Sequence, residues 1–189
     1  MNLRLLRSRA KRFTRRVRAQ VLRVTQPGWS APWGVQVGRW CRIQIDHGGT
    51  IRLGAGCELD DGVTVAAAPG AVVDLAPGVF VGHHSTVAAA SSVRIGAGTF
   101  LAELVSVRDH DHDETHPIAS GPKNVEAVMI GADCWLASKV TVVRGASIGD
   151  GVIVGANSVV RGVLGADMVA VGSPAVARRL RRRSNGHES

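Results

Sequence analysis

The sequence predicts an all-β fold, a parallel β-helix of about six coils with one long inserted loop. Bulky aliphatic residues recur six positions apart: Ile130, Leu136, Val142, Ile148, Val154 and Val160. A small or β-branched residue follows four positions later, at Cys134, Val140, Ala146, Val152 and Ser158. A helix repeats every 3.6 residues and a strand every two, so neither alone explains this period. One face of a β-helix coil explains it, because each face is a short strand and a turn with the aliphatic side chain inside.

The composition agrees with a narrow solenoid. The 189 residues include 23 Gly and no Tyr, and 45% of them are hydrophobic. A narrow interior accepts Val, Ile, Leu and Ala but few rings, so the shortage of aromatics is expected. The cysteines Cys41, Cys57 and Cys134 each lie four residues after an aliphatic, in the small inward position. We therefore interpret them as packing residues in a reducing compartment, which predicts a cytoplasmic protein.

Residues 1–25 predict a basic amphipathic helix that ends before Pro27. Nine of these residues are Arg or Lys and none is acidic. Its apolar residues at helical spacing are Leu3, Leu6, Ala10, Phe13, Val17, Val21 and Val24. The segment lacks the apolar run of a signal peptide or a membrane span. Three interpretations remain: a cap on the solenoid or a contact with a partner subunit, a peripheral helix on an anionic membrane surface, and an organellar transit peptide.

Residues 26–36 predict a linker whose two tryptophans seal the first coil, and the β-helix domain follows over residues 37–177. Similar phrases begin at positions 53, 75, 95, 130 and 148. The interval of 35 residues between the third and fourth exceeds three hexads by seventeen, which predicts an extended loop over about 108–128. Residues 178–189 predict a basic C-terminal tail or short helix.

The formal net charge of +8 comes from the two ends of the chain. Residues 26–177 hold nine basic and fourteen acidic residues, a balance of −5. Residues 178–189 hold five Arg against one Glu. Because the body offers no basic face, the sequence argues against nucleic acid as a partner.

Candidate functional residues gather in the long loop and at one predicted corner of the coils. The loop carries His110, His112 and His116 among several acids. Counting two past the inward aliphatic of successive coils gives a column of Asp61, His83, Glu103, Ser138 and Ala156. We expect the loop to leave the body near this column. Trp135 precedes an inward Leu, so its ring is expected to face outward beside a ligand groove or a subunit contact.

These motifs resemble the left-handed β-helix, hexapeptide-repeat acyltransferases, among them galactoside and maltose acetyltransferases and polysaccharide O-acetyltransferases. The resemblance rests on the repeated hexads, the extended His loop, the segment IGADCWLASKVTV and the closing GSPA, and it covers about 37–180. It implies the left-handed winding, acetyl-CoA as acyl donor, a homotrimer with the site between subunits, and a saccharide acceptor. No metal is expected, and the expected activity is O-acetylation of a cell-surface polysaccharide precursor.

The resemblance also implies roles for individual residues. The family's catalytic His follows a V-x-V strand, which here gives His110, with His112 as the second candidate. An imidazole can remove the proton from a sugar hydroxyl near neutral pH. Asp109 or Glu103 is expected to orient the ring, and His83 and His84 are assigned to the acceptor. The residues assigned to coenzyme A are Trp135, Ser138, Lys139, Ala156, Arg161 and Arg179, where Arg161 stands in place of the family's usual lysine.

Two other classes of function remain open. A gamma-type carbonic anhydrase shares this fold and binds zinc through three histidines, for which His83, His110, His112 and His116 are the available ligands. The spacing of these histidines and the tail GSPAVARRL favour a transferase. The second alternative is a trimeric scaffold without catalytic activity.

Overall fold

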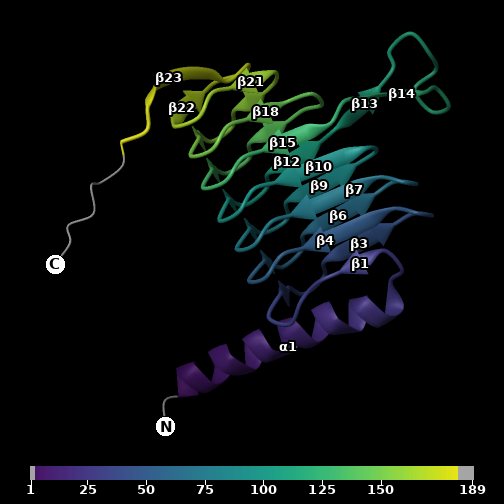
Figure 1. Cartoon of the computed structure of the whole chain (residues 1–189), viewed down its shortest axis with the longest axis vertical. Helices are drawn as coiled ribbons and strands as arrows, with labels where there is room; N and C mark the ends of the chain where they lie inside the picture. The colour runs from purple at the N-terminus through teal and green to yellow at the C-terminus, as the bar shows by residue number, and fades with distance from the viewer. Residues whose placement is uncertain (1–2, 183–189) are drawn as a thin grey trace.

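The computed structural model describes residues 3–182 as one helix followed by a solenoid of short parallel strands (Figure 1). The helix α1 spans Leu3–Thr25. The strands then repeat in groups of three, each strand joining a different sheet, so that β1–β3 form the first coil. Six such coils are complete, and β21 and β22 begin a seventh. The predicted all-β solenoid of about six coils is therefore confirmed.

Sheet A contains β1 (Trp29–Ser30), β4 (Thr50–Leu53), β7 (Val72–Leu75), β10 (Ser92–Ile95), β15 (Val128–Ile130), β18 (Ser147–Ile148) and β21 (Val163–Leu164). Sheet B contains β2 (Gln36–Val37), β5 (Glu58–Leu59), β8 (Phe80–Val81), β11 (Phe100–Leu101), β16 (Trp135–Leu136), β19 (Ile153–Val154), β22 (Met168–Val171) and β23 (Val176–Leu180). Sheet C contains β3 (Arg42–Ile45), β6 (Thr64–Ala67), β9 (Thr86–Ala89), β12 (Ser106–Arg108), β17 (Thr141–Val142) and β20 (Val159–Val160).

The six-residue period is the period of burial. Leu136 pairs in register with Leu101 on one side and Val154 on the other, and all three side chains are buried. The small positions between them are also buried, including Cys134 and Ser158. Because the ladder stacks each aliphatic on its equivalent, one continuous core runs through the coils. Removing one such side chain, as in Leu136→Ala, typically costs about 2–5 kcal/mol.

Each turn from sheet B to sheet C places one residue in the left-handed region of backbone conformation. The residues at this position in successive coils are Trp40, Gly62, His84, Leu104, Lys139 and Asn157, with φ between 55° and 76°. In all but the last of these coils, the residue before this position accepts a backbone hydrogen bond from the next coil, as Glu103 does from the Lys139 amide at 3.0 Å. This repeated geometry stacks the side chains at this corner into a column.

The structure adds short strands beyond both expected ends of the solenoid. Residues 26–36 are not simply a linker, because β1 pairs with β4 and so belongs to the first coil. Trp29 is buried and its Nε1 donates to the Ala19 carbonyl at 3.1 Å, whereas Trp33 is exposed. At the other end β23 returns antiparallel to β22, so residues 176–180 form a strand rather than a tail or helix. Residues 183–189 lie outside the described part of the chain.

The long loop is a β-hairpin that leaves the body at a different corner from the one expected. β13 (His110–His112) pairs antiparallel with β14 (Lys123–Val125). The hairpin joins β12 of sheet C to β15 of sheet A and projects from the side of the solenoid (Figure 1). The column of Glu103 and Ser138 lies instead between sheets B and C. The width of sheet C therefore separates the two sets of candidate residues within one chain.

Candidate active site

Asp109 and His110 form a coupled pair at the base of the hairpin. The Asp109 carboxylate is fully buried and accepts the backbone amides of Ala90, Ser91 and Ser92, each at 2.7 Å. Its Oδ1 also lies 2.9 Å from Nδ1 of His110. The previous coil thus fixes the carboxylate, and the carboxylate fixes the imidazole.

This contact places the Asp109 carboxylate, one of the two candidate acids, beside the imidazole ring. A proton on Nδ1 of His110 is donated to Asp109, which leaves Nε2 as the unprotonated nitrogen. Among the described residues, Nε2 has no hydrogen-bond partner. Glu103 lies at the corner between sheets B and C instead, where it accepts a hydrogen bond from Ser138 Oγ. Of the two acids that the sequence proposed, Asp109 is the one in place.

The other histidines of the hairpin lie in different surroundings. His112 is exposed on β13, opposite Lys123 of β14. His116 lies in the exposed tip, where its Nδ1 is 3.0 Å from Asp113 Oδ2. In residues 3–182, no group of three or more His, Cys, Asp or Glu side chains is arranged to hold a metal ion.

Arg144 joins the hairpin to the following coil, a role that the sequence analysis missed. Its Nε donates to Asp111 Oδ2 at 2.8 Å, and its Nη1 contacts Glu126. The hydrogen bond from Arg144 lowers the pKa of the Asp111 carboxyl, and the same bond raises the pKa of Arg144. The signal in the sequence was an Arg two residues after an inward Val in the coil that follows the loop. Arg144 also lines a surface cavity of about 320 Å³ with Arg161, Asp111 and Glu126.

A second cluster occupies the corner between sheets B and C. Glu103 and Ser138 lie on adjacent coils, and the hydrogen bond from Ser138 lowers the pKa of Glu103. Lys139 and Ala156 are exposed at the same corner. Trp135 is exposed on sheet B, in register with Phe100, which stacks on Phe80 with ring centroids 4.5 Å apart. The predicted column is confirmed, and an aromatic row runs beside it.

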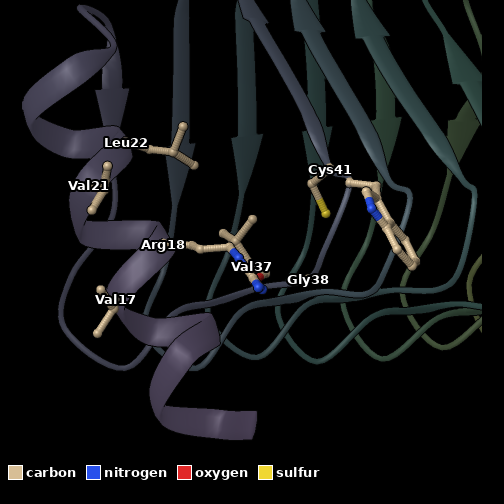
Figure 2. A pocket seen from close by; sticks show the side chains of 8 residues that line it. Val17, Arg18, Val21, Leu22, Val37, Gly38 and Cys41 are labelled. Carbon is tan, nitrogen blue, oxygen red and sulfur yellow. The ribbon is translucent and has the colours of Figure 1, made fainter.

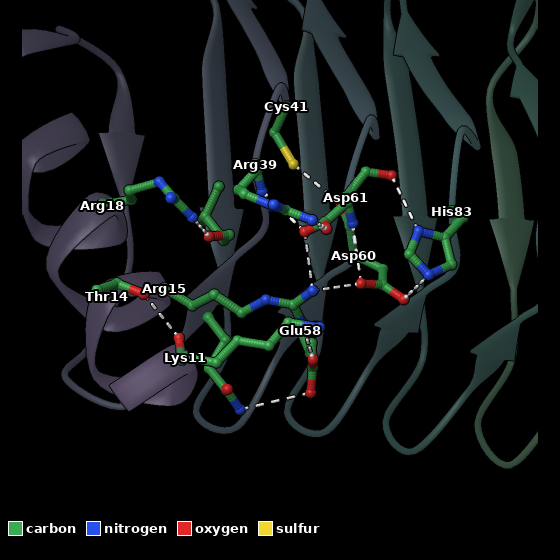
Figure 3. Close-up of polar contacts among 12 residues, drawn as sticks. Lys11, Thr14, Arg15, Arg18, Arg39, Cys41, Glu58, Asp60, Asp61 and His83 are labelled. Carbon is green, nitrogen blue, oxygen red and sulfur yellow. Dashed lines mark hydrogen bonds and ion pairs between the residues drawn. The ribbon is translucent and has the colours of Figure 1, made fainter. Parts of the chain in front are cut away.

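His83 and His84 lie at the same corner, one coil closer to the N-terminus than Glu103. Contacts with Asp60 and Asp61 already occupy the ring nitrogens of His83. Nε2 of His83 is 2.9 Å from Asp60 Oδ2, and its Nδ1 is 3.4 Å from the Asp61 carbonyl oxygen. His84 is exposed, with its ring 6.4 Å from that of His83. Figure 3 shows that His83 belongs to a polar network that also contains Arg15 of α1.

The residues assigned to coenzyme A therefore lie in three separate parts of the subunit. Ser138, Lys139 and Ala156 share the corner between sheets B and C, with Trp135 beside them on β16, whereas Arg161 follows β20 at the hairpin corner. Arg179 is exposed on β23 at the C-terminal end of sheet B.

Comparisons with known proteins identify the family and several relatives of this chain. Residues 127–162 match the bacterial transferase hexapeptide family (six repeats). The Escherichia coli K12 protein WbbJ, named as an O-acetyl transferase of lipopolysaccharide biosynthesis, is 36% identical over 152 residues, which are 72% of this chain and 78% of WbbJ. WcaF of the same strain, named as a colanic acid biosynthesis acetyltransferase, is 36% identical over 104 residues, which are 54% of this chain and 55% of WcaF.

A solved structure shares the fold at low sequence identity. AntD from Bacillus cereus, an N-acyltransferase in complex with dTDP and 3-hydroxybutyryl-CoA, superposes with a TM-score of 0.71. The two sequences are 17% identical, over 85% of this chain and 88% of AntD.

Proposed function

Because this chain belongs to the bacterial hexapeptide-repeat transferases and is an acyltransferase, we propose that it transfers an acetyl group from acetyl-CoA to a hydroxyl of a saccharide. The observation that carries this proposal is the Asp109–His110 pair, in which a buried carboxylate holds an imidazole with Nε2 free. A sugar hydroxyl is a weak nucleophile at neutral pH, and such a pair supplies the general base that it needs.

In the proposed reaction His110 Nε2 takes the hydroxyl proton while the hydroxyl oxygen attacks the thioester carbonyl. The new C–O bond forms, the C–S bond breaks, and the proton on the imidazole passes to the departing thiolate of coenzyme A. Asp109 stabilises the imidazolium that exists between these two proton transfers. General base catalysis of this kind contributes roughly 10²–10⁴ in rate.

The proposed donor site uses Trp135, Ser138, Lys139 and Ala156 of one subunit. These residues lie on neighbouring coils at one corner, where the exposed Trp135 ring offers an apolar surface to the pantetheine arm. Arg161 at the hairpin corner and Arg179 on β23 supply cations for the phosphates. Because the donor corner and His110 lie on opposite sides of sheet C, we propose a homotrimer in which neighbouring subunits complete each site.

The proposed acceptor is a precursor of a cell-surface polysaccharide. Its support is that the names of WbbJ and WcaF place them in lipopolysaccharide and colanic acid biosynthesis as acetyltransferases. We place the reaction in the cytoplasm, since the three cysteines are unpaired and two of them are buried in the core. Among the described residues, no helix combines the length and the apolar character needed to cross a membrane.

The test compares the activities of His110→Ala and His112→Ala. Activity is measured as the rate at which the thiol of coenzyme A is released. We expect the first variant to lose roughly 10²–10⁴ in turnover with coenzyme A binding retained, because only the proton transfer is removed. His112→Ala should stay close to the parent enzyme, since no carboxylate among the described residues hydrogen-bonds to this imidazole. Equal activity of both variants and the parent would remove His110 from the mechanism. The accompanying mass measurement should give about three times 19.8 kDa.

A further inference from the structure

The helix α1 attaches to the solenoid through the face opposite its apolar stripe. Ala19 is fully buried and Arg15 is 4% exposed, whereas Phe13 and Val24 of the stripe are 60% and 87% exposed. A helix turns about 100° per residue, so Ala19 and Arg15 each lie about 200° from Val17, at the centre of the stripe. The helix thus covers the end of the solenoid through Arg15, Ala19 and the partly buried Leu22, and it leaves most of its apolar stripe exposed. We call Phe13, Val17, Val21 and Val24 the outer stripe.

A buried ion-pair network holds the helix in this orientation. Arg15 contacts Glu58, and its Nη2 donates to Asp61 at 2.9 Å and to Asp60 (Figure 3). Burial alone raises the pKa of Asp61, but hydrogen bonds from the Arg39 amide and from both guanidinium groups outweigh it and hold that pKa well below its usual range. Rotating the outer stripe inward would leave these carboxylates without their buried cation, which is strongly unfavourable.

Exposed cations lie on both sides of the helix, beyond the edges of the outer stripe. At about 100° per residue, Lys11 lies about 120° from Val17 on one side, and Arg23 and Arg12 lie about 120° and 140° from it on the other. Residues 3–25 contain no Asp or Glu to neutralise them. An apolar stripe between cationic flanks is the arrangement of helices that lie in the headgroup region of an anionic bilayer.

The first coil adds amphipathic aromatic rings at the same end of the molecule. Trp33 and Trp40 are 64% and 76% exposed. Trp40 also lines a cavity of about 250 Å³ between the helix and the first coil, together with Val17, Val21 and Leu22 (Figure 2). Tryptophan is favoured at membrane interfaces, where its ring contacts apolar groups while its N–H stays hydrated.

We propose that the outer stripe, its flanking cations and these two tryptophans bind the surface of an anionic lipid bilayer. A second copy of the chain is a poorer occupant, because two such faces would bring like-charged flanks together. A bilayer with anionic headgroups satisfies both features at once, since acyl chains cover the stripe and phosphates pair with the cations.

Membrane binding of this kind sets the orientation of the enzyme. Since α1 lies across the N-terminal end of the solenoid (Figure 1), the coils would stand on the bilayer with the first coil nearest to it. Strand β12, which leads into the hairpin, is the fourth strand of sheet C, so it lies about 14 Å further along the axis than β3. In the proposed trimer all three helices would face the same membrane, which multiplies the binding.

The test measures co-sedimentation of the full chain with phosphatidylcholine vesicles, with and without phosphatidylglycerol. We expect binding only to the anionic vesicles, release at high salt, and a blue shift of tryptophan emission on binding. Arg12→Gln/Arg23→Gln removes two cations and should weaken partitioning onto the vesicles about 30-fold. Each basic residue near an anionic surface contributes about 1 kcal/mol, which is about fivefold in the partition coefficient. Phe13→Ser/Val24→Ser should weaken it at least about tenfold, because these exposed side chains provide apolar contact with the lipid.

The controls carry the same substitutions at the opposite end of the molecule. Val176→Ser/Leu180→Ser and Arg178→Gln/Arg182→Gln alter exposed residues of β23 and its continuation, and both should bind vesicles like the parent. Circular dichroism checks that each variant is folded. Absence of binding to anionic vesicles at low salt would overturn the proposal. Equal weakening of vesicle binding by the control pairs would also overturn it. A change of oligomer mass in Phe13→Ser/Val24→Ser without a change in vesicle binding would identify the stripe as a contact between copies of the chain instead.

Discussion

Replacing Asp109 with Asn tests whether the carboxylate sets the tautomer of His110. Oδ2 of Asp109 accepts the amides of Ser91 and Ser92, while Oδ1 accepts the Ala90 amide and faces His110 Nδ1. In Asp109→Asn the side-chain amide oxygen is expected to take the position of Oδ2, where it still accepts the backbone amides of Ser91 and Ser92. The NH₂ group then points at the Ala90 amide and at the imidazole. Nδ1 must become an acceptor, so the ring proton moves to Nε2, the atom needed as the base.

The expected losses in activity and in stability follow from these contacts. With Nε2 protonated the general base is lost, so turnover should fall by roughly 10²–10⁴, as for His110→Ala. Stability should also fall, because one hydrogen bond to a charged acceptor disappears and the partly buried Ala90 amide faces another donor. Together these changes cost about 2–5 kcal/mol. His110→Ala should cost much less stability, because it leaves the three backbone bonds of Asp109 intact.

The assay combines initial rates of thiol release with thermal unfolding. Asp113→Asn is the matched control, because Asp113 also faces a histidine Nδ1, that of His116, but in the exposed hairpin tip. It should change neither turnover nor melting temperature appreciably. If Asp109→Asn retained turnover within about twofold of the parent while remaining folded, the tautomer argument would be refuted.

Two further predictions concern the attachments of the hairpin and the helix. Arg144→Ala should raise amide exchange across residues 110–125. The parent should show the same loosening as pH falls below about 4, because the pKa of Asp111 is lowered in the folded state and protonation of its carboxylate removes the ion pair. Unchanged exchange in this variant would mean that the hairpin holds its position by other contacts. Arg15→Met should release α1 from the first coil, at a cost of about 3–5 kcal/mol for carboxylates left without their buried cation, and limited proteolysis should then cut near residue 25. A helix equally resistant in both proteins would show that Trp29 and Leu22 suffice to hold it.

The coils were predictable from the sequence because their period is the period of burial. Counting from the inward aliphatic also located the column at the corner between sheets B and C, since every coil repeats the same turn. The first strand, β1, escaped prediction because it has only two residues and shows no hexad of its own. Strand β23 escaped it because its five residues are all exposed, so no burial pattern marks them.

The hairpin and the helix depend on interactions that a periodic pattern does not contain. An insertion of seventeen residues interrupts the count, so the sequence placed the loop and His110 at the wrong corner. The apolar stripe of α1 suggested the buried face, but the structure buries Arg15 instead. That choice depends on three carboxylates more than forty residues away, Glu58, Asp60 and Asp61, which no local signal connects to the helix.

The separation of the two candidate corners gives a direct test of a shared site. Residues from Glu103 to Asp109 cross sheet C, a span of up to about 20 Å in extended conformation, so one subunit does not bring Ser138 and His110 together. In the proposed trimer, each site takes His110 from one subunit and the donor corner from its neighbour. His110→Ala removes the first half, and Ala156→Trp blocks the second at an exposed position.

Mixing these two inactive variants should therefore restore activity. After random reassembly three quarters of the trimers contain both variants, and each of those has one junction with two intact halves among its three. The mixture should recover about a quarter of the parent activity. Reassembly is needed for this recovery, so mixing without subunit exchange is the control. A reassembled mixture that stayed as inactive as either variant alone would show that each subunit contains its own complete site.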